Sequence, residues 1–155
     1  MKIVQYLLVV LITGLVAGLG SWLTTQGIEW YYLSHLPTLA PAGSVIGGVW
    51  TVVFIASAGS LILWLQQKEK TANYYRVIWW FGVNAVLNLA WTYLFFFQRQ
   101  VGASIIEMVG LELSVLILIW LMWKKRIYSS ILLIPYAVWV LFATYLAYNF
   151  WILNR

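Results

Sequence analysis

Two amides and a tryptophan follow one another at helical spacing in the segment N-A-V-L-N-L-A-W, residues 84–91. Asn84, Asn88 and Trp91 are four and three residues apart, so a helix would place all three on one face. An amide that faces lipid leaves hydrogen-bonding groups unpaired, at several kcal/mol each in hydrocarbon. This face must therefore point inward, toward other helices or toward a cavity where an amide can orient a ligand.

Two other segments carry aromatic side chains at the same spacing. Trp50 and Phe54 are four residues apart, and a later segment has Tyr136 followed by Trp139, Ala143 and Leu146. Bulky aromatics with a few polar groups and a small residue are typical of an apolar pocket, which would hold a flat hydrophobic ligand by stacking and burial. The alternative is that these stripes only pack the core of a helical bundle.

Acidic and catalytic residue types are scarce. Glu112 lies in the middle of an apolar segment, where a carboxyl group must face the bundle interior. It is either a proton or ligand site or a structural acid, protonated or hydrogen-bonded; the structural role is favoured because no Lys or Arg is available at that depth. Glu107, nearer the segment end, is expected at the interface. With no Cys, His35 as the only His, and no clustered carboxylates, we predict neither a catalytic set nor a metal site.

The elements that position these residues are membrane-spanning helices. Hydrophobic residues make up 64% of the 155 residues and charged residues 8%, against about 25% charged in soluble domains. A span needs about 20 apolar residues. We predict an all-α integral membrane protein, a single five-helix transmembrane domain over 1–155, with a long loop at 24–43. The predicted helices cover residues 3–24, 44–66, 77–97, 105–123 and 130–152. The first is too long for a signal peptide.

The net charge of +5 reflects topology rather than nucleic-acid binding. Seven basic residues fall on one side of a five-helix topology: Lys2, Lys68, Lys70, Arg76, Lys124, Lys125 and Arg126. Only Arg99 and Arg155 fall on the other side. Because basic residues concentrate on the cytoplasmic side, we predict a cytoplasmic N-terminus and an external C-terminus. The pattern fits a bacterial cytoplasmic membrane. The basic clusters are also candidates for contact with anionic membrane lipid.

Small and aromatic residues outside the stripes have simpler interpretations. Gly14 and Gly18 form a GxxxG pattern, which we expect to pack within the chain rather than to drive dimerisation. Aromatic residues beside the basic clusters are expected to form interfacial belts: Tyr74, Tyr75, Trp79, Trp80, Trp120, Trp123 and Tyr128. The long loop holds Trp30, Tyr31 and Tyr32 and is either a binding lid or an interfacial anchor.

Three segments resemble the translocator protein / tryptophan-rich sensory protein family, also called the peripheral-type benzodiazepine receptor family. P-T-L-A-P-A-G-S-V-I-G-G-V-W-T-V-V-F (residues 37–54) is similar to its proline-containing loop and second helix. N-L-A-W-T-Y-L-F-F (88–96) is similar to its third-helix signature, and L-L-I-P-Y-A-V-W-V-L-F-A-T-Y-L (132–146) to its fifth. The resemblance covers nearly the whole chain.

The resemblance implies a five-helix bundle, often a homodimer, that binds porphyrins and in some members sterols beneath the first loop. It requires no cofactor beyond a porphyrin or heme-type tetrapyrrole as ligand. The implied ligand-binding positions, besides Asn84 from the spacing, are Tyr31, Pro41, Trp50, Phe54, Asn88, Trp91, Trp139, Ala143 and Leu146. Leu39 and Ala42 stand where the family usually has a lid tryptophan and a second proline. The family often has Gln where this chain has Asn84, and Asn where it has Ala147.

Three functions compete at this point. The first is binding, and with it transport or sensing, of porphyrins or similar planar hydrophobic ligands. The second is a membrane scaffold or regulatory subunit without its own ligand, which predicts an aromatic interior closed by packing. The third is light-dependent porphyrin degradation, for which Trp50 and Trp139 are present but the lid tryptophan is not.

Overall fold

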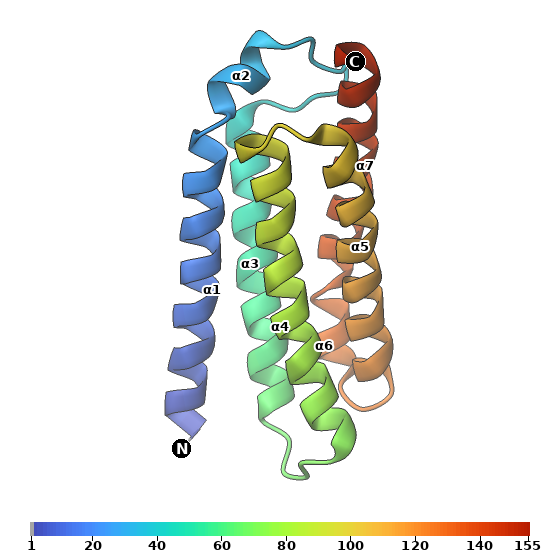
Figure 1. Cartoon of the computed structure of the whole chain (residues 1–155). Coiled ribbons are helices and arrows are strands. Elements are labelled where there is room, and N and C mark those ends of the chain that lie inside the picture. The colour runs from blue at the N-terminus through green and yellow to red at the C-terminus, as the bar shows by residue number, and fades with distance from the viewer. Residues whose placement is uncertain (1) are drawn as a thin grey trace.

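Five long helices lie side by side and make up most of the protein (Figure 1). The computed structural model describes residues 2–155. Five helices are long and apolar enough to cross a membrane, which confirms the predicted fold class. The elements are α1 Lys2–Thr25, α2 Ile28–Leu33, α3 Gly43–Leu65, α4 Ala72–Thr92, the π-helical turn η1 Tyr93–Phe97, α5 Val101–Trp123, α6 Ile127–Ile131 and α7 Ile134–Asn154.

Two spans begin earlier than the hydropathy pattern predicted. The third starts at Ala72 rather than at 77, and the fourth at Val101 rather than at 105. Charge near Arg76 ends an apolar window but does not end a helix, because backbone hydrogen bonds and not hydropathy fix helix ends. In addition, Asn73 Nδ2 donates to the Leu121 carbonyl at 3.0 Å and holds the first turn of α4 against α5.

The predicted fifth helix is broken near its start. α6 ends at Ile131 and α7 begins at Ile134, with Pro135 in its first turn. Proline has no backbone N–H and its ring clashes with the carbonyl four residues earlier, so a continuous helix through 130–136 is disfavoured. The chain instead makes a short turn in which Leu133 N donates to the Ser130 carbonyl at 3.0 Å.

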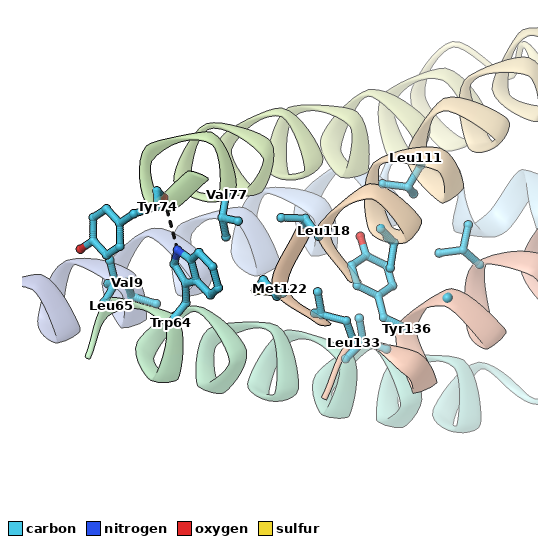
Figure 2. Packing of buried hydrophobic residues seen from close by; sticks show 14 residues of the cluster. Val9, Trp64, Leu65, Tyr74, Val77, Leu111, Leu118, Met122, Leu133 and Tyr136 are labelled. Carbon is cyan, nitrogen blue, oxygen red and sulfur yellow. Dashed lines mark hydrogen bonds between the residues drawn. The ribbon is translucent and has the colours of Figure 1, made fainter. Parts of the chain in front are cut away.

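The interior is tightly packed at the end of the bundle that holds the N-terminus. Trp64 of α3 is fully buried, and its Nε1 donates to the Tyr74 carbonyl of α4 at 3.2 Å (Figure 2). Leu118 and Met122 of α5 close the same cluster. Tyr74, predicted to lie in an interfacial belt, is therefore a core residue, because its ring stacks on Trp64 at 6.5 Å.

The first loop covers the opposite end, where the C-terminus lies (Figure 1). It contains the short helix α2, which the sequence prediction of a loop over 24–43 did not include. Asn154 clamps the segment after α2 to the end of α7: its Oδ1 accepts from His35 N and its Nδ2 donates to the His35 carbonyl, both at 2.9 Å. Gly27 approaches the Phe96 carbonyl so closely that a Cβ would not fit there.

The GxxxG pattern of α1 does not pack within the chain as predicted. Gly14 and Gly18 are exposed, and a Cβ built on either would meet no atom within 4 Å. The opposite face of α1 packs on α3 and α4. The prediction was wrong because a small-residue pair marks a possible close approach without saying which surface approaches it.

Candidate functional site

An apolar cavity of about 410 Å³ lies beneath the first loop, within the half of the bundle that holds the C-terminus. α1, α2, α3, α4, η1 and α7 all contribute to its wall. Aromatic and small side chains predominate in a lining made of Ala17, Gly20, Ser21, Thr24, Ile28, Tyr31, Tyr32, Gly43, Ile46, Gly47, Trp50, Thr51, Phe54, Asn88, Trp91, Thr92, Phe95, Phe96, Trp139, Ala143, Leu146, Ala147 and Phe150.

Three tryptophans from three helices meet in this wall. The Trp50 ring stacks on Trp91 with centroids 5.5 Å apart and an interplanar angle of 27°. It meets Trp139 edge to face, at 6.5 Å and 89°. Aromatic pairs in these geometries add about 0.5–1.5 kcal/mol beyond burial, so the three rings hold one another in place. The result is a fixed aromatic surface suited to a flat ligand.

Polar groups in the wall are few and only partly paired. The indole Nε1 atoms of Trp91 and Trp139 are buried and have no hydrogen-bond partner among the described residues. Asn88 uses its Nδ2 to donate to Tyr136 Oη at 3.1 Å, and no described residue donates to its Oδ1. An unpaired donor in an apolar cavity is costly unless a ligand or water supplies an acceptor. The wall therefore contains two buried indole N–H groups and one amide oxygen that are not paired with another described residue.

Asn84, one turn before Asn88 in α4, makes its hydrogen bonds within the bundle. Its Nδ2 donates to Ser114 Oγ at 2.8 Å, and its Oδ1 accepts from Tyr136 Oη at 3.2 Å. Ser114 in turn donates to the Leu111 carbonyl at 2.7 Å. These bonds join α4, α5 and α7 below the cavity, so Asn84 supports the site without lining it.

Eight of the predicted ligand-binding positions line the cavity together: Tyr31, Trp50, Phe54, Asn88, Trp91, Trp139, Ala143 and Leu146. Two do not. Asn84 is the network residue just described, and Pro41 lies in the connection between α2 and α3, outside the lining. Pro41 shapes the approach to α3, because proline restricts both its own backbone and that of the preceding residue.

The roof of the cavity comes from α2, η1 and the last turns of α7. The Tyr31 ring stacks on Phe150 at 5.3 Å and 18°, and lies near Phe95 and Phe96 at about 6 Å. Burial raises the pKa of the Tyr31 hydroxyl, with a smaller contribution from neighbouring Tyr32. Tyr31 therefore faces the cavity as a neutral phenol.

Sequence reasoning missed the contribution of α1 and η1. Ala17, Ser21 and Thr24 form one stripe on α1, and all three line the cavity. Their spacing of four and three residues was available in the sequence, but small residues in a span are usually read as helix contacts. Phe95 and Phe96 belong to the π-helical turn, in which side-chain spacing departs from the α-helical pattern.

Both interior acids differ from expectation. Glu112 is buried at 7% exposure, as predicted, but both its carboxyl oxygens lack a hydrogen-bond partner among the described residues. Glu107 was expected at the interface; instead its two oxygens are also buried and unpartnered. The reason is the earlier start of α5 at Val101, which puts Glu107 nearly two turns inside the helix. Neither acid lines the cavity.

Comparison with known proteins agrees with this architecture. A model of the TspO/MBR family matches residues 7–152. The chain belongs to this family.

Relatives of this TspO/MBR chain occur in all domains of life. It is 30% identical over 151 residues to the uncharacterized membrane protein YtaB of Bacillus subtilis, covering 96% of this chain and 95% of the relative. The tryptophan-rich protein TspO of Archaeoglobus fulgidus is 28% identical over 155 residues, with coverage of 99% and 97%. Human translocator protein is 26% identical over 127 residues, with coverage of 81% and 75%. The resemblance inferred from three short segments is thereby confirmed.

Proposed function

We propose that this protein binds a planar, largely apolar tetrapyrrole such as a porphyrin in the cavity beneath its first loop, for transport or sensing. The observation that carries the proposal is the apolar cavity whose wall contains the stacked rings of Trp50 and Trp91 and the edge-to-face ring of Trp139. An apolar cavity with a few fixed polar groups is the usual form of a site for a hydrophobic small molecule. A tetrapyrrole offers a flat face that stacks on these rings, and its carboxylate or ring-nitrogen acceptors suit the indole N–H groups of Trp91 and Trp139, which have no partner among the described residues.

The scaffold function predicts an interior closed by packing. Such packing is present in the cluster around Trp64 and Tyr74, but the half of the bundle beneath the loop contains the cavity. A void lined by aromatic groups loses the contacts that a filled interior would make, because close packing is what stabilises a core. A ligand that fills the cavity restores those contacts, which favours binding over a purely structural role.

The test is an absorbance titration of protoporphyrin with purified protein in uncharged detergent, following the shift of the main porphyrin band. Trp139→Phe keeps an aromatic ring and removes the N–H donor. One lost hydrogen bond is worth about 0.5–1.5 kcal/mol, so the apparent Kd should rise about two- to tenfold. Trp91→Phe should act in the same direction.

The matched control is Trp120→Phe, because Trp120 is 75% exposed and lies outside the cavity. Its Kd should equal that of the wild type. Thermal unfolding of each variant without porphyrin separates lost binding from lost structure. Non-saturable shifts of equal size in all four proteins would mean that porphyrin only partitions into detergent, and would refute the proposal.

We further propose that the end of the bundle with the N-terminus faces the cytoplasm. The connection from α3 to α4 and that from α5 to α6 both lie at that end (Figure 1) and carry Lys68, Lys70 and residues 124–126. Basic loops remain on the cytoplasmic side during insertion. The chain has no cysteine, so Leu39→Cys should react with an impermeant maleimide on intact cells and Glu69→Cys should not. The reverse labelling pattern would contradict this orientation.

A further inference from the structure

A second hollow, a groove of about 680 Å³, lies at the C-terminal end of the bundle. Its wall comes from α2, the start of α5 and the end of α7. Trp30 and Phe150 separate it from the aromatic cavity: Phe150 lines both hollows, and the Trp30 ring meets it edge to face at 5.4 Å. This groove plays no part in the function proposed above.

Both basic residues of this end of the protein line the groove. The Arg99 guanidinium lies over the Trp30 ring at 5.8 Å, and the Arg155 guanidinium over the Trp151 ring at 5.1 Å. A guanidinium over an indole face is fixed by cation–π attraction while its N–H groups stay free at the edges. Among the described residues, neither guanidinium donates a hydrogen bond, and no acidic side chain lines the groove.

Polar groups complete the wall of the groove. His35, Gln100 and Asn154 add polar side chains to the lining, and Gln100 precedes α5, whose first turn has no acidic residue. Glu29, on α2, is exposed and is not part of the wall. Two guanidinium groups held over indole rings, in one concave wall that contains no acidic side chain, are suited to an oxyanion because the guanidinium fork matches phosphate geometry.

The backbone at Arg99 supports a role for its side chain. Arg99 has φ 57°, in the left-handed region, at the turn between η1 and α5. Glycine is the usual residue at such a position because it has no Cβ, and Arg is less favourable there by about 1–2 kcal/mol. Arginine at this position therefore costs backbone stability relative to glycine, and a role for its side chain would offset that cost.

We propose that this groove binds the phosphate group of an amphiphile or soluble phosphate through Arg99 and Arg155. A membrane phospholipid is one source of that group, since Trp30 and Trp151 mark the headgroup level and Leu33, 81% exposed, offers an apolar surface beside it. A free phosphate or phosphate ester is the other source. Either would bring the same tetrahedral anion to the two guanidinium groups.

The experiment is hydrogen exchange of the whole purified protein in uncharged detergent, without porphyrin, so that it stands apart from the first proposal. Three probes are added separately: dioleoyl-phosphatidylglycerol, dioleoylglycerol as the same lipid without phosphate, and inorganic phosphate. We expect phosphatidylglycerol to protect residues 99–104 saturably and dioleoylglycerol to leave them unchanged. Protection by inorganic phosphate as well would identify a soluble phosphate as a sufficient ligand and would also support the site.

The deciding variant is Arg99→Gly, which removes the charge and suits the left-handed backbone, so the fold is retained. Its apparent Kd for phosphatidylglycerol, read from protection of residues 99–104, should rise about fivefold, and that of Arg99→Gly with Arg155→Gln at least tenfold. Lys125→Gln removes a charge at the opposite end and should leave this protection unchanged. If no phosphate-bearing probe protects the segment, or if protection is equal in wild type and both arginine variants, the groove is not an oxyanion site.

Discussion

Replacement of Gly27 by alanine is expected to displace the roof of the cavity. An added Cβ would clash with the Phe96 carbonyl oxygen and would lie 2.7 and 2.8 Å from the Phe96 carbonyl carbon and Cα. Carbon atoms in contact prefer about 3.5–4.0 Å, so the two backbones would have to separate by about 1 Å. Both partners are main chain, one leading into α2 and the other in η1, and neither can turn away as a side chain would.

Such a clash costs about 1–3 kcal/mol, and the upper end applies because no flexible group can absorb it. For a chain of this size, about 3 kcal/mol corresponds to a fall in Tm of roughly 6–12 °C. The displacement also moves α2, whose Tyr31 ring stacks on Phe150 over the cavity. Thermal unfolding in detergent should therefore show a lower Tm, and amide exchange of residues 28–34 should become faster.

Alanine substitutions at two other glycines provide a comparison for the destabilisation expected of Gly27→Ala. A Cβ at Gly82 of α4 meets nothing within 4 Å, so Gly82→Ala should stabilise its helix by about 0.5–1 kcal/mol. A Cβ at Gly43 would meet only the hydroxyl end of Tyr32. That side chain can rotate away, so Gly43→Ala should cost less than Gly27→Ala. If Gly27→Ala unfolds at the wild-type temperature and residues 28–34 exchange at the wild-type rate, the inferred close approach of the two backbones is wrong.

Two further predictions concern hydrogen bonds that position the site. Tyr136→Phe removes a hydroxyl that makes two buried hydrogen bonds, so the free energy of unfolding in detergent should fall by about 1–2 kcal/mol. The control Tyr128→Phe, at a residue 76% exposed, should change this free energy little. Equal effects of the two substitutions would contradict the hydrogen-bond network around Tyr136. Asn154→Ala removes both side-chain hydrogen bonds to the His35 backbone. Because these bonds hold the loop to α7, amide exchange at residues 34–36 should become about tenfold faster. Unchanged protection of these amides would show that another contact holds the loop.

Hydropathy located the spans because lipid exposure demands long apolar segments, but it could not locate their ends. The first turn of α4, which begins at Ala72, is held against α5 by a bond from Asn73 to the Leu121 carbonyl, between residues far apart in the sequence. The break before α7 was also missed, although Pro135 lies inside the predicted span 130–152 and disfavours a continuous helix there. A hydrogen bond between residues distant in the sequence cannot be read from a window of consecutive residues, whereas a proline within the window can be.

The site was predictable to the extent that helical spacing controls which face a side chain occupies. Trp50 with Phe54, and Trp139 with Ala143, do share a wall of one cavity. Spacing does not give depth along the bundle, which is why Asn84 was grouped with Asn88 although only the latter reaches the cavity. The family pattern likewise transferred Pro41 by position, while the fold places it outside the lining.

The difference between Asn84 and Asn88 marks where closed packing gives way to the cavity. One helical turn separates them, and Tyr136 bonds to both. Toward the N-terminal end, the Trp64 cluster fills the interior; toward the loop, Phe95 and Phe150 form a second cluster beneath α2. The cavity lies between two packed regions, so its walls are held from both ends and it can persist as a void. A ligand that fills it would add contacts without having to order the bundle, which is how a preformed site retains binding energy.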